Sequence, residues 1–93
     1  MNYSSINKVL TNGDSLIKEI AKANPNEVLI AIKKMSLSID KDIEALINGK
    51  KVYIKKDFGL EIDYSDPDIK SFDILTNNVT VYAIFTFTSK AVV

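Results

Sequence analysis

The stretch VTVYAIFTFT, residues 79–88, is the strongest strand signal in this chain. It is rich in β-branched and aromatic residues, which favour strands, and its side chains alternate between two faces. At about 3.3 Å per residue, ten residues span about 33 Å. One face is apolar enough to belong to a core and consists of Val79, Val81, Ala83, Phe85 and Phe87. The stretch therefore predicts a long strand with one buried face.

The opposite face of the same strand carries no charge. It consists of Thr80, Tyr82, Ile84, Thr86 and Thr88. An exposed strand usually carries Lys or another charge that discourages pairing with a foreign strand, and here the first such residue is Lys90. We therefore expect this face to be covered, and we favour another chain over helices as its cover. A homodimer through strand 79–88 would be twofold symmetric, with Tyr82 and Ile84 among its contacts.

The residues that precede this strand also show strand periodicity. Asn77 and Asn78 predict a turn, since Asn tolerates positive φ, and Asp66-Pro67-Asp68 predicts a loop. Alternation with a period of two on either side of residues 56–59 predicts a hairpin over residues 51–64. The expected result is an antiparallel β-meander with strands at about 51–56, 59–64, 71–75 and 79–88.

The first half of the chain shows helical spacing instead. Apolar residues three and four positions apart predict helix throughout residues 4–23, with a kink or break near Gly13. If the helix ends there, Asp14 caps a second helix. The chain is thus expected to open with helical structure, as one helix or two.

Two further helices are expected before the meander. Asn24-Pro25 is typical of a helix start and predicts a helix over residues 25–36, although the β-branched run at 28–32 also suits a strand. The apolar residues Ile39, Ile43 and Ile47 share one helical face and predict a helix over residues 39–48. The overall prediction is a single α+β domain, residues 1–93, with N-terminal helices at about 4–23, 25–36 and 39–48 followed by the meander.

The composition excludes several classes of function. The chain has no Cys and no His, which removes disulfides, thiolate metal sites and the commonest general base. All twelve basic residues are Lys and the net charge is zero, which argues against a dedicated nucleic-acid binder. We expect no enzymatic activity, no cofactor and no metal. Without a signal peptide or an apolar run of about 18 residues, the expected location is cytoplasmic and not in a membrane.

The triplet Asp57-Phe58-Gly59 matches a protein-kinase motif but lacks its context. Kinases also need a Gly-rich loop, a strand lysine and a catalytic loop, and none of these is present. We interpret the triplet as a hairpin turn, in which Gly59 supplies special backbone angles and Phe58 covers the edge of the core.

Six carboxylates gather between residues 57 and 73. Their spacing does not match a calcium-binding loop, and the small core offers no cleft for a glycosidase pair. The segment carries a net charge of −5, whereas residues 1–56 carry +4. Such polarity steers association with an oppositely charged partner, although charge runs of this kind more often lie on an ordinary solvated face. The candidate partner-binding residues are Asp57, Glu61, Asp63, Asp66, Asp68, Asp73, Tyr82 and Ile84.

We also expect the acidic segment to matter for function and not for folding. Replacing Asp63, Asp66 and Asp68 together by Lys should leave stability nearly unchanged, because exposed charges contribute little.

These observations favour a small non-enzymatic protein that binds another protein, in the style of phage or mobile-element proteins that inhibit or adapt host machinery. One alternative is a winged-helix-like DNA-binding regulator, with residues 39–48 as the recognition helix and 51–64 as the wing. Against it, Asp40, Asp42 and Glu44 near the start of that helix would repel phosphate. A second alternative is an oligomeric structural or assembly component.

Overall fold

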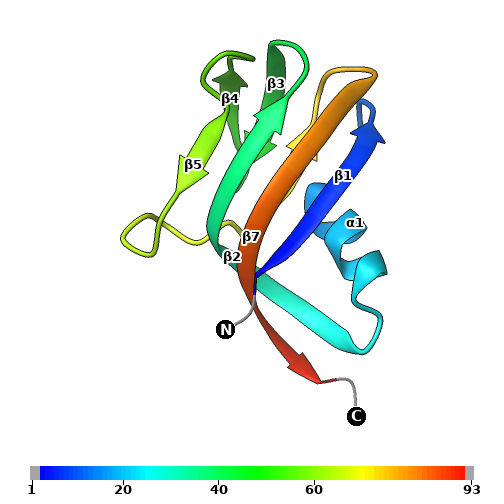
Figure 1. Ribbon diagram of the computed structural model, residues 1–93, viewed down its shortest axis with the longest axis vertical. Helices are drawn as coiled ribbons and strands as arrows, with labels where there is room; N and C mark the ends of the chain where they lie inside the picture. The colour runs from blue at the N-terminus through cyan, green and yellow to red at the C-terminus, as the bar shows by residue number, and fades with distance from the viewer. Residues whose placement is uncertain (1–2, 92–93) are drawn as a thin grey trace.

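The computed structural model describes the backbone of residues 3–91 and all of their side chains except those at positions 29, 30 and 91. These residues form one helix and seven strands (Figure 1). In chain order the elements are β1 (Ser4–Leu10), α1 (Leu16–Ala23), β2 (Glu27–Ile39), β3 (Ile43–Ile47), β4 (Lys50–Ile54), β5 (Leu60–Ile62), β6 (Phe72–Ile74) and β7 (Val79–Ala91). The protein is therefore mostly β, with two antiparallel sheets and a strand, not a helix, as its first element.

The strand predicted at residues 79–88 exists, continues to Ala91 and lies in the middle of the larger sheet. That sheet has the order β1-β7-β2-β5, and the smaller sheet has the order β4-β3-β6. On one side of β7, Ser4 of β1 lies opposite Phe85. On the other side, Ile39 of β2 lies opposite Val81. Over residues 81–85 both backbone edges of β7 are thus occupied, whereas residues 86–91 of β7 pair only with β2.

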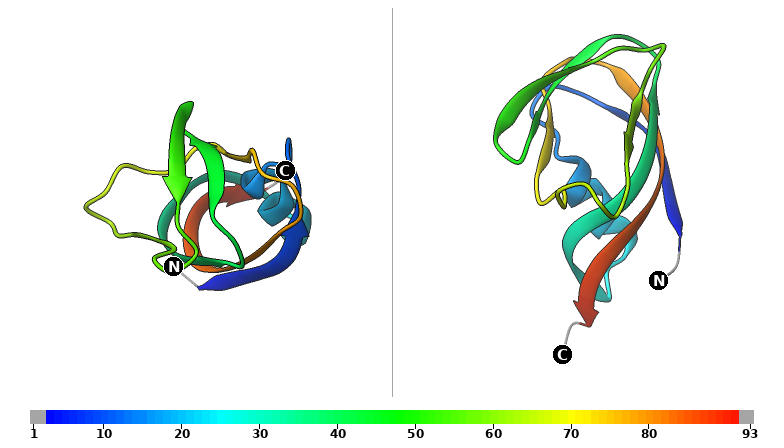
Figure 2. Two further views of the ribbon diagram at one scale, coloured as in Figure 1. Left: turned by 90° about the horizontal axis from the view of Figure 1, so that it is seen from above. Right: turned by 90° about the vertical axis from the view of Figure 1, so that its left-hand side faces the viewer.

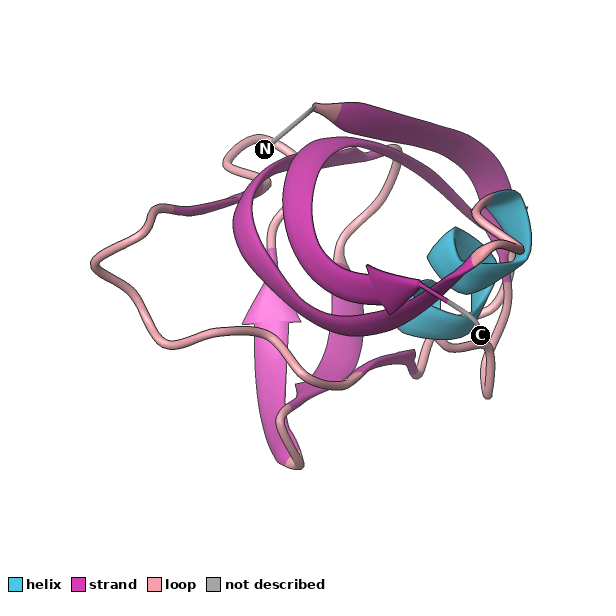
Figure 3. Cartoon of the chain, turned by 90° about the horizontal axis from the view of Figure 1, so that it is seen from below, coloured by secondary structure: helices cyan, strands magenta, loops and turns pink. Residues whose placement is uncertain are grey.

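The larger sheet is strongly curved because β2 is irregular. Its register with β7 shifts between Leu29 and Ala31 and again between Ile32 and Lys34. Such bulges bend a strand and increase its twist. Figures 2 and 3 show β2 and β7 coiling together as a result. The smaller sheet and α1 lie on the concave side of the curved sheet (Figures 1 and 2).

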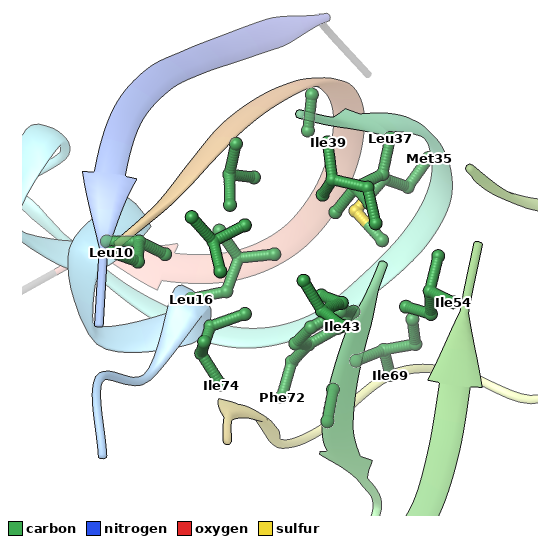
Figure 4. Packing of buried hydrophobic residues seen from close by; sticks show 14 of the residues in the cluster. Leu10, Leu16, Met35, Leu37, Ile39, Ile43, Ile54, Ile69, Phe72 and Ile74 are labelled. Atoms are coloured by element: carbon green, nitrogen blue, oxygen red, sulfur yellow. The ribbon is translucent and has the colours of Figure 1, made fainter. Parts of the chain in front are cut away.

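The core fills the space between the curved sheet, the smaller sheet and α1 (Figure 4). The strand face predicted to be buried does point into this space: Val79, Val81, Ala83 and Phe85 are buried. Phe87 is half-buried and packs against the same cluster. The other large contributors are Leu10 of β1, Leu16 and Ile20 of α1, Met35 and Leu37 of β2, Ile43 of β3, Ile54 of β4, and Phe72 and Ile74 of β6.

The first predicted helix is wrong over its first half. Residues 4–10 form β1, which pairs with β7, and only the second half is helical as α1. Gly13 has a φ of +97°, which ends the strand in a turn. The helix cap is Ser15, whose side chain accepts a hydrogen bond from the Lys18 backbone N–H, and not Asp14. Pairing with β7 outweighs the helical spacing of residues 6–10.

The second and third predicted helices are strands. Asn24 ends α1, its side chain donating a hydrogen bond to the Ile20 carbonyl, so Asn24-Pro25 does not begin a helix. Residues 27–39 form β2, as the β-branched run allowed. Residues 43–47 form β3, and Asn48-Gly49 is the turn that leads into β4. The recognition helix required by a winged-helix arrangement is therefore absent from the described residues.

The predicted hairpin over residues 51–64 is not a paired hairpin. Its first strand, β4, pairs with β3, and its second strand, β5, pairs with β2 in the other sheet. Gly59 does supply positive φ, at +63°, as predicted. Phe58, however, is 86% exposed and does not cover the core. The short strand at 72–74 and positive φ at Asn78 are confirmed, but β6 joins β3 and does not continue a meander.

Candidate functional site

The convex face of the larger sheet, which we call the outer face, is an open surface with exposed Val9, Tyr82 and Ile84 side chains. In Figure 1 it is turned toward the viewer, and α1, β3 and β4 lie behind it. The strand register sets its side chains in rows: Ser5, Ile84 and Ser36 form one row, and Asn7, Tyr82 and Ser38 form the next. Val9 and Thr80 complete it near the start of β7. None of these eight residues is charged.

The large apolar side chains of the outer face remain in contact with solvent. Val9 is 58% exposed, Tyr82 is 47% exposed and Ile84 is 42% exposed. Of the strand face predicted to be covered, Thr86 is buried and Thr88 half-buried, whereas Tyr82 and Ile84 are not covered within the described residues. Because β1 and β2 occupy both edges of β7 over residues 81–85, association through Tyr82 and Ile84 has only the outer face available.

A hollow of about 450 Å³ lies on the outer face beside β5. We call it the acidic hollow, since three carboxylates gather at it. Its lining includes four of the predicted partner-binding residues, which sequence reasoning assigned to two separate segments: Glu61, Asp63, Asp66 and Ile84. The structure brings these segments together because β5 and β7 flank β2 in the same sheet. The acidic segment and the uncharged strand therefore form one continuous surface.

Three other side chains of the acidic hollow were missed from the sequence: Tyr3, Lys34 and Ser36. Lys34 lies over the ring of Tyr64, with its Nζ 5.7 Å from the ring centroid. Ser36 donates a hydrogen bond of 3.4 Å to the Glu61 carboxylate. Residues 34–38 alternate between outward and buried side chains, so a strand assignment for β2 would have found Lys34 and Ser36. The sequence holds no comparable signal for Tyr3.

Two carboxylates of the hollow also shape the loop after β5. The Asp66 Oδ2 atom accepts a hydrogen bond of 2.8 Å from the Asp63 backbone N–H. The Asp63 Oδ1 atom accepts one of 2.7 Å from the Tyr64 N–H. Side chains that bond to nearby backbone in this way fix the conformation of a turn. These residues are therefore structural as well as acidic.

The remaining predicted site residues lie outside the hollow. Asp68 forms an ion pair of 2.7 Å with Lys33, and both side chains are about one-third exposed. Asp73 lies on β6 opposite Leu46 in the smaller sheet. Asp57 is exposed in the loop between β4 and β5. Tyr82 is on the outer face, in the row next to that of Ile84.

The arrangement suits binding by surface contact. Among residues 3–91, no group of three or more carboxylates comes together in a way that would hold a metal ion. The acidic hollow combines apolar contact from Tyr3 and Ile84 with a charged border, which is the chemistry of protein recognition. With eight residues, α1 falls well short of a membrane-spanning helix, and the structure describes no other helix.

Comparison with protein-family models, with curated proteins and with solved structures finds no match for this chain.

Proposed function

We propose that this chain is a non-enzymatic protein-binding module whose partner docks on the outer face. The observation that carries the proposal is the pair Tyr82 and Ile84, which stand exposed on a central strand among uncharged neighbours. Aromatic and apolar residues at the centre of a patch, with polar residues around them, are typical of protein interfaces. Because the strands beneath are paired on both sides, the patch is rigid and needs no ordering before it binds.

The chemistry of the partner follows from the charges beside this patch. Glu61, Asp63 and Asp66 border its β5 side, and they carry three of the carboxylates of the segment with a net charge of −5. A partner that presents an apolar patch next to Lys or Arg side chains is complementary to both features. Such charge complementarity mainly raises the association rate, whereas the apolar centre holds the complex together.

The partner can be captured by crosslinking, and its binding to variants of this chain can then be measured. A photo-crosslinking phenylalanine analogue in place of Tyr82 should capture it, whereas the same analogue in place of Tyr53 should not. Tyr53 is a matched control because it is 69% exposed on the other sheet. With the purified partner, Tyr82→Lys combined with Ile84→Lys should weaken binding by about 100-fold, which is the loss expected when interface centre residues are removed.

Circular dichroism melts establish that the variants remain folded. Tyr53→Lys should bind like the wild type. If Tyr53→Lys weakens binding as much as the double variant does, the partner docks on the smaller sheet and the proposal fails. Capture of a protein other than this chain itself at position 53, with none at position 82, leads to the same conclusion.

A further inference from the structure

The two sheets leave a second opening between them, bordered by one edge strand from each. β4 is an edge of the smaller sheet and β5 is an edge of the larger sheet. Residues of both strands line a cleft of about 520 Å³, which we call the inter-sheet cleft. Ile69, which also lines the cleft, is fixed to β2 by two backbone hydrogen bonds with Ile32, of 2.8 and 3.0 Å.

The walls of the inter-sheet cleft are apolar and incompletely covered. Ile47, Val52, Leu60 and Ile62 line it, and all four are only half-buried although they pack against the core. Val52, Leu60 and Ile62 lie on strands with an unused edge, because β4 pairs only with β3, and β5 only with β2. Free backbone edges beside apolar side chains are a template for pairing with another strand.

The two borders of the cleft carry opposite charges. β4 begins with Lys50 and Lys51, and the loop after it adds Lys55 and Lys56. Lys51 is paired with Glu44, and Lys55 with Asp42. The β5 side carries Glu61, followed by Asp63 and Asp66. Lys50 lines the cleft and forms no ion pair within residues 3–91. One border is thus complementary in charge to the other. Within one molecule the two borders lie on opposite sides of the cleft.

We propose that the inter-sheet cleft is closed by a second copy of this chain. β4 and β5 run in opposite directions (Figure 1). A twofold axis parallel to these strands sets β4 of one copy against β5 of the other in antiparallel orientation, and it does so twice. Each contact joins a lysine-bearing edge to an acidic edge, and each continues one sheet into the next molecule. Such a dimer is closed and self-complementary.

This dimer goes beyond the proposed function because its contacts are sheet edges, and Tyr82 and Ile84 of both copies stay open to a partner. Glu61 and Asp66 line both the inter-sheet cleft and the acidic hollow, so the dimer is not tested by partner binding. Its test is the oligomeric state, which does not depend on any partner. A failure of one proposal is therefore distinct from a failure of the other.

The experiment exchanges the charges of the two borders. Lys50→Glu replaces the lysine that lines the β4 border by an acid, and Glu61→Lys replaces an acid of the β5 border by a lysine. Light scattering at about 100 µM should give a dimer for the wild type, and each variant should dimerise at least about tenfold more weakly, since two contacts change from attraction to repulsion. An equal mixture of the two variants should recover the dimer, because each basic border then meets an acidic one. Lys18→Glu on α1 is the matched control and should dimerise like the wild type, because the Lys18 side chain is exposed and does not line the cleft.

A wild type that stays monomeric at this concentration would overturn the proposal, and binding of a foreign peptide to that monomer would assign the cleft to another occupant. A mixture that remains monomeric would show that charge does not direct the contact. If either variant melts early, its binding is measured instead with Lys50→Gln or Glu61→Gln, which remove one charge and should weaken the dimer by a smaller factor.

Discussion

Asn48 connects the turn between β3 and β4 to the segment that precedes β6. Its φ of +51° and the φ of +81° at Gly49 are the backbone angles that a two-residue hairpin requires. The Asn48 Oδ1 atom accepts hydrogen bonds from the backbone N–H groups of Lys70 and Ser71, at 2.8 and 3.2 Å. Its Nδ2 atom donates one of 2.8 Å to the Asp68 carbonyl. One side chain thus joins segments that are twenty residues apart.

Two substitutions separate the contribution of positive φ at Asn48 to stability from that of its side-chain hydrogen bonds. Asn48→Gly keeps the positive φ but loses the side-chain bonds, and it should lower the free energy of unfolding by about 1–2 kcal/mol. Asn48→Ala also strains the backbone and should cost about 1 kcal/mol more. Urea unfolding measures both values. If the two variants were equally stable, positive φ would not matter at this turn.

Gly59 is required for a different reason, namely the close approach of two backbones. A Cβ atom at this position would lie 2.3 Å from the Leu37 carbonyl oxygen in β2. Gly59→Ala should therefore displace β5 and cost about 3 kcal/mol or more. Gly49→Ala is the matched control: its φ is also positive, but nothing lies within 4 Å of the added Cβ atom, so it should cost only about 1 kcal/mol. Thermal melts that rank the two variants the other way would contradict this reading.

At the scale of elements, the strands were predictable where their side chains alternate, and they were missed where alternation is interrupted. The residues of β7 alternate between its two faces without interruption, and the sequence predicted this strand. In β2, the bulges bury Ala31 and Ile32 in succession, so the run resembles one side of a buried helix. In β3, the apolar residues fit both periods, and only Asn48-Gly49 favours a hairpin over a helix end. β1 and β7 lie far apart in the sequence, so local sequence patterns cannot predict that they pair.

The loop between β5 and β6 should be less tolerant of charge reversal than its exposure suggests. Replacing Asp63, Asp66 and Asp68 together by Lys removes two hydrogen bonds within the turn and the ion pair with Lys33. We expect a loss of about 2 kcal/mol in the free energy of unfolding, not the near-neutral result that the sequence predicted.

Asp57→Lys is the control for this loop. Asp57 is exposed and forms no hydrogen bond or ion pair within the described residues, so the change should stay within about 0.5 kcal/mol. Equal melting temperatures for the triple variant and the wild type would show that the loop is held by its backbone alone.

At the scale of the whole molecule, carboxylates in the connection between β2 and β3 hold remote segments together. The Asp40 Oδ1 atom accepts a hydrogen bond of 2.9 Å from the Thr80 N–H at the start of β7. The Asp42 Oδ1 atom accepts one of 2.9 Å from the Lys56 N–H in the loop before β5. These backbone hydrogen bonds lower the pKa of Asp40 and of Asp42, because they favour the ionised form.

Stability should therefore depend on these two carboxylates in acid. Since each folded pKa lies below the value of about 3.9 in the unfolded chain, their contribution is present above about pH 4 and is lost as the pH falls through the folded pKa. Asp40→Asn combined with Asp42→Asn should lower stability at pH 7 and flatten its decline below pH 4. Urea midpoints between pH 2.5 and 7 check this. A double variant that declines as steeply as the wild type would assign the acid sensitivity to other groups.

Part of the candidate site was within reach of the sequence. Tyr82 and Ile84 were found because an uncharged face on a long strand needs an explanation, and Glu61 was found through the charge of its segment. That these residues share one surface was out of reach, since it depends on β2 lying between β5 and β7. The role of Asp66 in its own loop was also hidden, because charge alone does not show which backbone group a carboxylate accepts from.

The central position of β7 has a consequence for biosynthesis. β1 and β2 are both synthesised before β7. They do not pair with each other, because β7 lies between them in the sheet. The contact of Ser4 with Phe85 closes a very long loop, a kind of contact that slows folding to milliseconds or seconds. Until residue 85 leaves the ribosome, the nascent chain presents two unpaired strand edges. The risk of aggregation is therefore greatest just before the strand that removes it emerges.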